Sequence, residues 1–535
     1  MRRQTACLKG SMKHRHGQLN ILLGIAVAAL LLASACAELP AHIERSESHA
    51  LRGTKTTLLG RIGEALLKTH PGESGFRPLR NGVDALLWRM VLAEAAERSL
   101  DVQYYIWHND LTGRFFANAL LRAADRGVRV RVILDDVGAR SDDETLLSLD
   151  AHSNIEIRLF NPVASRSFRS LGMLTDFSRL NRRMHNKSFI ADNQRAILGG
   201  RNIGDEYFEA QSEVAFGDLD VLAVGRGVSD VSDAFDRYWN APASIPISAL
   251  LGRSGDPASL DALRAELAAF VESQRDSPYV TRARSQLTEL MAAGTAGFFW
   301  GKAYLLYDDP AKISRAPEDT EGHLLPQFAD LGAQVRHELL IVSPYFVPGD
   351  AGVAWLRGLV KRGVRVTVLT NSLAATDVGA VHAGYQRYRE ALLEADVRLY
   401  EVKPDAIEYE RAKRGKGGIS GSRASLHAKT FVFDRRAVFI GSLNLDPRSI
   451  QLNTEIGLVC ESVPLAEELA GTLEKKIDTI AWRLERIVDA SGSARIVWVE
   501  TGAEGPRQRT EEPEASAWRR LSVWFLGLLP IESQL

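Results

Sequence analysis

The chain has 535 residues, of which 45% are hydrophobic and 25% charged, a globular composition with enough length for two domains of ordinary size. A formal net charge of −1 provides no overall attraction to nucleic acid, whose binding proteins usually carry a basic excess, so no nucleic-acid partner is expected. Three cysteines are too few for a disulfide-stabilised scaffold of this size.

The N-terminal segment 1–35 is expected to be a secretion signal and not part of the fold. A basic stretch, 2–15, precedes the apolar run 21–32, which is shorter than the roughly 20 residues needed to span a bilayer. Ala33-Ser34-Ala35 fits an ordinary cleavage site, and Cys36 also fits a lipoprotein site at which that cysteine is acylated. An uncleaved anchor is the third alternative. All three place the folded part outside the cytoplasm.

Residues 37–71 are polar and predict a tether, after which a first domain is expected over 72–243. Its first helix is predicted over 84–98 from helical periodicity. A strand, a helix and a strand then follow, over 99–106, 113–126 and 128–134. Because strands and helices alternate, we predict a mainly parallel α/β sheet.

A candidate half-site lies later in this domain. His185, Lys187 and Asp192 form the pattern H-x-K-x4-D, followed by Gly199-Gly200-Arg201-Asn202. Residues 188–191 are typical of a buried strand, so His185 and Lys187 should share one face. Asp192 lies at an odd offset and in a turn signal, so we expect it to brace the turn or a neighbouring segment instead of touching the reacting atom.

Residues 244–300 predict a helical insertion with no visible chemistry, and a second domain is expected over 301–487. A strand, a helix and a strand are predicted there over 334–342, 351–362 and 364–370. The peptide Arg-Gly-Val-Arg-Val occurs at 126–130 and again at 362–366. We therefore predict duplicated domains related by a pseudo-two-fold axis, with one active site at their interface.

The second domain repeats the half-site with the same spacing. His427, Lys429 and Asp434 precede Gly441-Ser442-Leu443-Asn444. Two imidazoles suit a phosphodiester, because one can attack phosphorus while the other protonates the leaving alcohol. Both lysines and the amides of Asn202 and Asn444 would hold the non-bridging oxygens, with Ser442 as a further phosphate ligand. This chemistry requires no metal and no other cofactor.

These residues resemble the paired HKD motifs of the phospholipase D superfamily, and the resemblance extends from about Phe76 to Ile487. Within it, the phrases SLDVQYYIWHND, GGRNIGDEYF, GDLDVLAVG, SPYFVPG and GSLNLDPRSIQLNTEIGLV are similar to bacterial cardiolipin synthases of the C type. The resemblance implies two similar phospholipase D-like α/β sandwich domains with the active site at their interface. Gly200 departs from the family pattern, which has serine there, as Ser442 does in the second copy.

The resemblance also implies roles for individual residues. Asp218 and Glu455 each follow a half-site where the family carries an acid that orients a catalytic imidazole, and Glu213 is a rival for Asp218. By analogy with related two-motif enzymes, His185 is the expected nucleophile and His427 the expected general acid.

Two later segments are candidates for contact with lipids. Residues 408–423 are basic and rich in glycine, which predicts either a loop that meets anionic headgroups or a solvated loop. In the C-terminal segment 488–535, residues 518–529 are apolar and aromatic beside cationic residues. They are too few to span a bilayer, so they lie in its interface or pack on the body, and we favour the interface.

Three functions compete. The first is a phosphatidyltransferase that makes cardiolipin from phosphatidylglycerol and a second phospholipid through a phosphohistidine. The second is a phospholipase D that releases phosphatidic acid, and the third is a secreted phosphodiesterase acting on nucleic acid. The export signal, the apolar tail and the neutral charge count against the third. We expect phospholipid and membrane-surface partners, and a periplasm-facing location in the bacterial envelope, with Cys36 as a lipid anchor if it is acylated.

Overall fold

The computed structural model of the chain describes residues 39, 43–139, 142–167, 169–210, 214–293, 297–406, 423–502, 505–530 and 532–535. The predicted secretion signal and Cys36 lie outside these residues. So do Glu213 and the basic segment 408–423 except for its last residue. The predictions made for these parts stay predictions.

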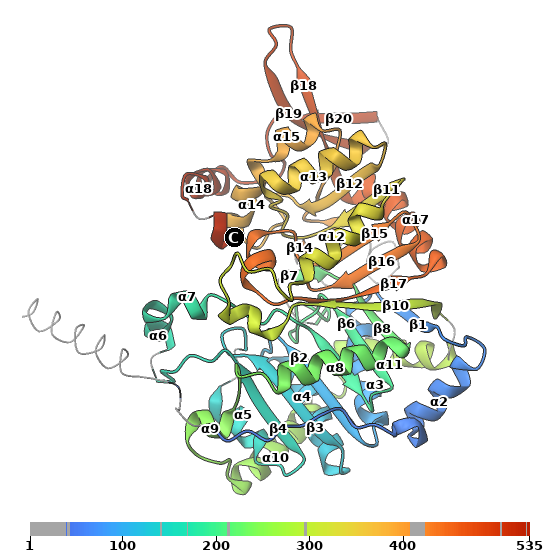
Figure 1. Cartoon of the computed structure of the whole chain (residues 1–535), viewed down its shortest axis with the longest axis vertical. Helices are drawn as coiled ribbons and strands as arrows, with labels where there is room; N and C mark the ends of the chain where they lie inside the picture. The colour runs from blue at the N-terminus through green and yellow to red at the C-terminus, as the bar shows by residue number, and fades with distance from the viewer. Residues whose placement is uncertain are drawn as a thin grey trace, which may run out of the picture.

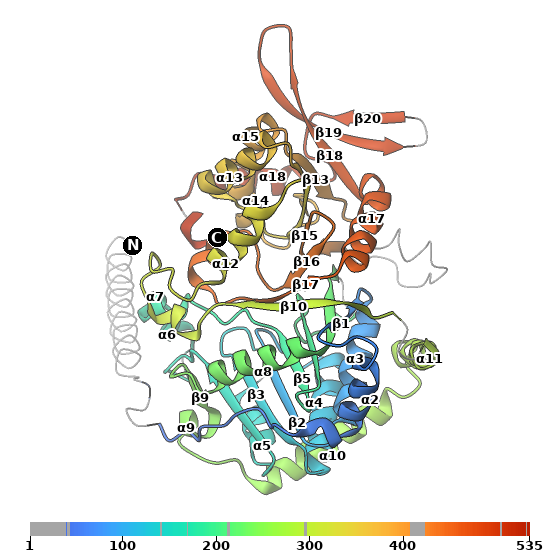
Figure 2. The ribbon, with the colours of Figure 1, turned by 45° about the vertical axis from the view of Figure 1, so that its right-hand side comes forward.

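Two α/β halves lie edge to edge and share one sheet (Figures 1 and 2). Strands of the first half follow the spatial order β9-β4-β3-β2-β5-β6-β8-β1. Strands of the second half follow β10-β17-β16-β15-β11-β12-β13-β18-β19-β20. Because β1 pairs with β10, the two orders join into a continuous sheet of 18 strands.

The first ten strands in chain order are β1 Ser74–Leu79, β2 Ser99–Tyr104, β3 Arg129–Asp135, β4 Ile155–Phe160, β5 Ser188–Ala191, β6 Arg195–Gly199, β7 Val214–Gly217, β8 Asp220–Gly225, β9 Ser244–Pro246 and β10 Phe299–Tyr307, of which β10 belongs to the second half. The other strands of the second half are β11 Glu338–Val342, β12 Arg365–Asn371, β13 Arg398–Val402, β14 Arg423–Leu426, β15 Lys429–Phe433, β16 Ala437–Gly441, β17 Ile456–Glu461, β18 Ala481–Val488, β19 Ala494–Gly502 and β20 Gly505–Arg509.

The helices of the first half are α2 Leu58–Leu67, α3 Gly82–Ala95, α4 Leu111–Asp125, α5 Asp143–Asp150, α6 Arg169–Thr175, α7 Phe177–Leu180 and α8 Arg226–Trp239, followed by α9 Ile247–Leu251, α10 Pro257–Ser273 and α11 Pro278–Ala293. Those of the second half are α12 Leu324–Gln334, α13 Gly349–Lys361, α14 Gly379–Gln386, α15 Arg389–Glu394, α17 Val463–Ile480 and α18 Ala517–Gly527. Side chains of α8 and α17 enter one apolar core together with strands of both halves, which fixes the halves to one another.

The expectation of a mainly parallel sheet is wrong. Parallel pairing is confined in the large sheet to β2-β3-β4 and β11-β12-β13, where helices connect the strands. The other pairings of this sheet are antiparallel. The reason is that each H-x-K-x4-D segment forms a hairpin, β5–β6 or β15–β16, and not another strand–helix unit.

The described part of the predicted tether is packed against the first half. The backbone carbonyl of Ser48 accepts a hydrogen bond from Arg131, and that of Ser46 accepts one from Arg158. Both arginines are almost fully buried on neighbouring strands. Buried guanidinium groups need hydrogen-bond acceptors, and this polar segment supplies them. The polar composition, from which a tether was predicted, instead reflects contacts with these buried arginines.

The C-terminal segment adds β19 and β20 to the sheet and then forms α18, which packs on α14. No helix among the residues that the structure describes is both long and apolar enough to cross a membrane.

Candidate active site

Tight hairpin turns present the two motifs. Asp192 and Asn193 have φ values of 52°, and Asp434 and Arg435 have 50° and 53°. In each turn a backbone N–H closes back onto the last strand residue, from Gln194 to the Ala191 carbonyl and equivalently in the second copy. Two successive residues at positive φ match the right-handed twist of paired strands, which explains the Asp-Asn in the first copy. The turn prediction is confirmed.

Asp192 and Asp434 brace neighbouring segments. The Asp192 carboxylate accepts backbone hydrogen bonds of 2.8–3.0 Å from Glu97, Arg98 and Ser99, where β2 begins. Asp434 accepts three from residues 336–338, where β11 begins, at 2.7–2.9 Å. The aspartates therefore join each hairpin to its adjacent strand by hydrogen bonds, as expected for residues that brace a neighbouring segment.

Each half supplies the carboxylate that contacts the histidine of the other half. His185 Nδ1 of the first half lies 2.9 Å from Glu455 Oε2 of the second. His427 Nδ1 of the second half lies 2.6 Å from Asp218 Oδ2 of the first. All four side chains are buried. Each imidazole is therefore oriented by a carboxylate that comes from the other half.

Backbone pairing between the halves produces this exchange. The His185 N–H donates to the carbonyl of Thr454, the residue before Glu455, at 2.9 Å. The His427 N–H donates to the carbonyl of Gly217, the residue before Asp218, at 2.8 Å. Strands β7 and β14 also pair in parallel across the interface. Since each histidine is in register with the residue before the opposite acid, its ring meets that carboxylate.

Two buried ammonium groups accompany the imidazoles. Lys187 Nζ donates to the His185 carbonyl at 2.6 Å, and Lys429 Nζ donates to the His427 carbonyl. Burial lowers the pKa of Lys187 well below its usual range and lowers that of Lys429 to about 8. Cations held this way suit the non-bridging oxygens of a phosphate, which would replace part of their lost hydration.

The electrostatics of the two imidazoles differ. Burial lowers the pKa of His185 well below its usual value, and Lys187 and Lys429 lower it further. Burial also lowers the pKa of His427, but Asp218 opposes that effect.

The two carboxylates differ in the same way. Although burial alone would raise the pKa of Asp218, His427 and Lys429 hold it below its usual range. Burial raises the pKa of Glu455 to about 7. The His427–Asp218 pair is thus better able to carry an imidazolium than the His185–Glu455 pair.

The Gly200 and Ser442 difference has a structural cause. The Ser442 hydroxyl donates to Glu455 and accepts from the Ile456 N–H, so it supports that carboxylate, and its role as a phosphate ligand stays a prediction. At Gly200 a Cβ atom would lie 2.2 Å from Asp218 Oδ1. The Leu219 N–H instead donates to Asp218 at 2.7 Å. The first half therefore has no space for the side chain that the second half uses.

The asparagines are also unequal. Asn202 Oδ1 accepts from the Ile106 N–H at 3.1 Å, and Asn202 Nδ2 donates to the Tyr207 hydroxyl at 3.0 Å. Asn444 Nδ2 lies 3.5 Å from Ser449 Oγ, and Asn444 Oδ1 is buried with no hydrogen-bond partner among the described residues. Both ends of the Asn202 amide are therefore hydrogen-bonded within the first half, whereas the amide oxygen of Asn444 can still accept a hydrogen bond from a ligand.

Two tyrosines and a further acid lie beside the site, and of these Tyr207 and Asp377 were not expected from the sequence. Tyr105 lies edge-on to the His185 ring and Tyr207 edge-on to the His427 ring, with centroid separations of 5.2 and 5.3 Å. Asp377, in the loop after β12, accepts from the Tyr345 hydroxyl at 2.8 Å and interacts electrostatically with Lys429. The acid at the carboxyl end of a parallel strand was the available signal for Asp377.

One group of potential metal ligands occurs among the described residues. Ligand atoms of His108, Asp110 and Glu206 lie within 4.8 Å of one another, and all three side chains are partly exposed. His108 Nδ1 is 3.3 Å from Glu206, whose carboxylate interacts electrostatically with His427. This group is separate from the imidazole–carboxylate pairs, neither of which contains a third ligand of this kind.

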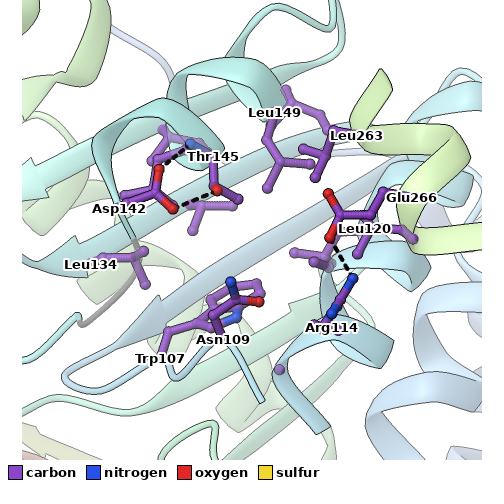
Figure 3. A pocket seen from close by; sticks show the side chains of 17 residues that line it. Trp107, Asn109, Arg114, Leu120, Leu134, Asp142, Thr145, Leu149, Leu263 and Glu266 are labelled. Carbon is purple, nitrogen blue, oxygen red and sulfur yellow. Dashed lines mark hydrogen bonds and ion pairs between the residues drawn. The ribbon is translucent and has the colours of Figure 1, made fainter. Parts of the chain in front are cut away.

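The helical insertion covers a cavity remote from this chemistry. The cavity has a volume of about 240 Å³ and lies between α4, α5 and α10. Figure 3 shows Arg114 and Glu266 paired at one side and Asp142 hydrogen-bonded to Thr145 at the other. None of the motif histidines or lysines lines it.

The composite arrangement of two HKD hairpins defines an enzyme of the phospholipase D superfamily. A family model described as "Cardiolipin synthase, PLD-like domain" matches residues 91–239 and 332–477. The chain is 45% identical over 475 residues to cardiolipin synthase C of Escherichia coli (strain K12), covering 87% of this chain and 97% of that protein. It therefore belongs to the cardiolipin synthase, PLD-like domain family.

More distant similarities agree with this assignment. Cardiolipin synthase A of Pseudomonas entomophila (strain L48) is 26% identical over 388 residues, covering 72% of this chain and 64% of the relative. The crystal structure of phosphatidylserine synthase from Haemophilus influenzae Rd KW20 matches with a TM-score of 0.51 at 15% identity, covering 79% of this chain and 92% of that chain. This second similarity is one of fold.

Proposed function

We propose that the protein is a phosphatidyltransferase that forms cardiolipin by moving a phosphatidyl group from one phospholipid to a hydroxyl of phosphatidylglycerol. The observation that carries the proposal is the exchange of carboxylates between the halves, which leaves two oriented imidazoles and two lysines in one buried site. The similarity to cardiolipin synthase C supports the choice of lipid substrates.

In the first step, the Nε2 lone pair of neutral His185 attacks the phosphorus of the donor lipid. The bond from phosphorus to the headgroup oxygen breaks, and His427 gives its Nε2 proton to the departing alcohol. The stronger depression of the His185 pKa, and the carboxylate of Asp218 beside His427, favour this division of roles. Lys187 and Lys429 would neutralise charge that builds up on the non-bridging oxygens.

In the second step, the hydroxyl of phosphatidylglycerol gives its proton to His427 and attacks the phosphorus. The bond from phosphorus to His185 Nε2 breaks, so cardiolipin leaves and both imidazoles return to their starting states. One headgroup alcohol is released per turnover. Glu455 and Asp218 would hold the Nδ1–H tautomers throughout.

The test is lipid turnover by the membrane-bound full chain, with labelled phosphatidylglycerol supplied alone or with phosphatidylethanolamine. We expect labelled cardiolipin from the wild type and none from His185→Ala. Phosphatidic acid as the main product would make the protein a hydrolase. Turnover of neither lipid would overturn the proposal and favour a phosphodiesterase with another substrate.

We also propose that the protein acts in the bacterial envelope, facing the periplasm. The basic and apolar segment 1–35 supports export, and the position of Cys36 supports a lipid anchor. Labelling of expressing cells with a radioactive fatty acid should mark the wild type and leave Cys36→Ser unlabelled. Labelling of both would place acylation elsewhere.

A further inference from the structure

An apolar stripe on α18 is the most exposed hydrophobic feature among the described residues. Its members recur at helical spacing and their side chains are between 52% and 77% exposed; they are Trp518, Leu521, Trp524, Phe525 and Leu528. We call them the α18 face. Single exposed hydrophobic residues need no explanation, but a contiguous aromatic stripe on one helix marks an interaction surface.

The opposite side of α18 is already used for packing. Val523 is buried in a small cluster with Leu373 and Ala383, and Leu526 packs against the same cluster. At Gly379 of α14 a Cβ atom would lie 3.3 Å from the Val523 side chain, so the two helices approach closely. The helix is thus anchored on the body while its other side stays uncovered, as expected for a face that meets a partner.

The position of α18 connects the face to the site. Arg519 donates to the backbone carbonyl of Thr376, and the next residue, Asp377, bonds Tyr345 and interacts with Lys429. The helix that carries the α18 face is therefore bonded to the loop that carries Asp377.

The first half carries another exposed aromatic residue. The chain after α18 ends against α7, where Asn181 Nδ2 donates to Gln534 and Arg448 bonds both Asn181 and the Leu535 carbonyl. Phe177 at the start of α7 is 51% exposed. Figure 1 shows α18 and α7 on the same side of the ribbon. The polypeptide runs from α7 directly into the first motif.

The chemistry of α18 fits a lipid surface. The helix contains two tryptophans and a phenylalanine, its charged residues are both arginines, and it contains no acid. Tryptophan favours the boundary between headgroups and acyl chains, and Arg520, which is 36% exposed and pairs with Glu511, is the arginine that anionic headgroups can attract. A helix of 11 residues lies along such a boundary and does not cross it.

We propose that the α18 face, with Phe177 as a second contact, docks the enzyme on an anionic phospholipid bilayer and holds the domain interface against the membrane surface. This inference rests on the proposed function, because substrate lipids must leave the same bilayer to reach His185. It adds the surface of contact and its orientation.

Brominated acyl chains provide the direct test, since they quench tryptophans inserted among them. Of the nine tryptophans, only Trp518 and Trp524 are exposed, so they dominate the signal. The full chain bound to brominated phosphatidylglycerol vesicles should be quenched, and the Trp518→Phe/Trp524→Phe variant should lose most of that quenching while it stays bound. Equal fluorescence with and without bromine would overturn the proposal.

A matched pair of variants tests the consequence for turnover. Leu521→Asp should lower turnover of vesicle lipid at least tenfold, whereas Val488→Asp, with the same 52% exposure but at the far end of β18, should not. Both should turn over short-chain, monomeric phosphatidylglycerol like the wild type. If the wild type does not turn over short-chain phosphatidylglycerol, the proposed function is wrong, while the proposed membrane contact is not affected. A concentration-dependent dimer broken by Leu521→Asp would instead assign the face to a second copy.

Discussion

Glu455 of the second half lies 2.9 Å from His185 Nδ1 of the first, and the reciprocal contact between Asp218 and His427 is 2.6 Å. Neither half contains a complete imidazole–carboxylate pair. The composite site is therefore a property of the interface, and its integrity depends on the backbone hydrogen bonds from His185 to Thr454 and from His427 to Gly217.

Replacement of Glu455 by glutamine should lower kcat by about 10²–10⁴-fold, because the amide cannot both orient the Nδ1–H tautomer and stabilise charge on the ring. The free energy of unfolding should change little, since the shape is kept. Glu461→Gln, which changes an exposed acid at the far end of β17, the strand that follows Glu455, is the control and should retain wild-type activity. Wild-type kcat in Glu455→Gln would remove this carboxylate from the mechanism.

The pH dependence of kcat/KM should be bell-shaped. Below pH 7 the Glu455 carboxylate, whose pKa burial raises to about 7, gains a proton and loses the negative charge that stabilises positive charge on the His185 ring. Above pH 8 Lys429, whose pKa burial lowers to about 8, loses its positive charge. Assays on short-chain phosphatidylglycerol measure both limbs.

The Lys429→Arg variant distinguishes the ionisation of Lys429 from that of Glu455. A guanidinium keeps its charge above pH 8, so the alkaline fall in kcat/KM should move to higher pH, at a lower maximum because the larger group fits the site less well. An unchanged alkaline limb in this variant would assign that ionisation to a group other than Lys429.

Addition of one methyl group at Gly200 should be costly. In Gly200→Ala the new Cβ would lie 2.2 Å from Asp218 Oδ1, so the carboxylate must move away from His427. We expect kcat to fall by about 10²-fold. Gly471→Ala, a helical glycine with no atom within 4 Å of the new Cβ, should keep wild-type activity. Full activity of Gly200→Ala would mean that Asp218 can move without consequence.

Asp192→Ala tests a structural role for the motif aspartate. It leaves three backbone N–H groups without their acceptor, which should lower the free energy of unfolding by about 3 kcal/mol in urea titrations. At temperatures where the variant stays folded, kcat should fall less than tenfold. A loss of kcat as large as that of His185→Ala, with unchanged stability, would give Asp192 a chemical role instead.

The sequence predicted the two hairpins, their turn residues and the duplicated halves, because these follow from local spacing and from repetition. It also pointed to Asp218 and Glu455. It could not assign each acid to an imidazole, since His185 and Glu455 are 270 residues apart and meet only through pairing between the halves. The contact of the Ser442 hydroxyl with Glu455 could not be predicted for the same reason, because sequence spacing does not define it.

The most direct test of the composite site is to identify the residue that carries the phosphatidyl group during turnover. The full chain would be mixed with labelled donor lipid, quenched within one turnover, digested and analysed by mass spectrometry. We predict a phosphatidyl adduct on the peptide containing His185, absent in His185→Ala and formed more slowly in His427→Ala. Cardiolipin formation without any adduct, or an adduct on His427, would contradict the proposed division of roles between the two halves.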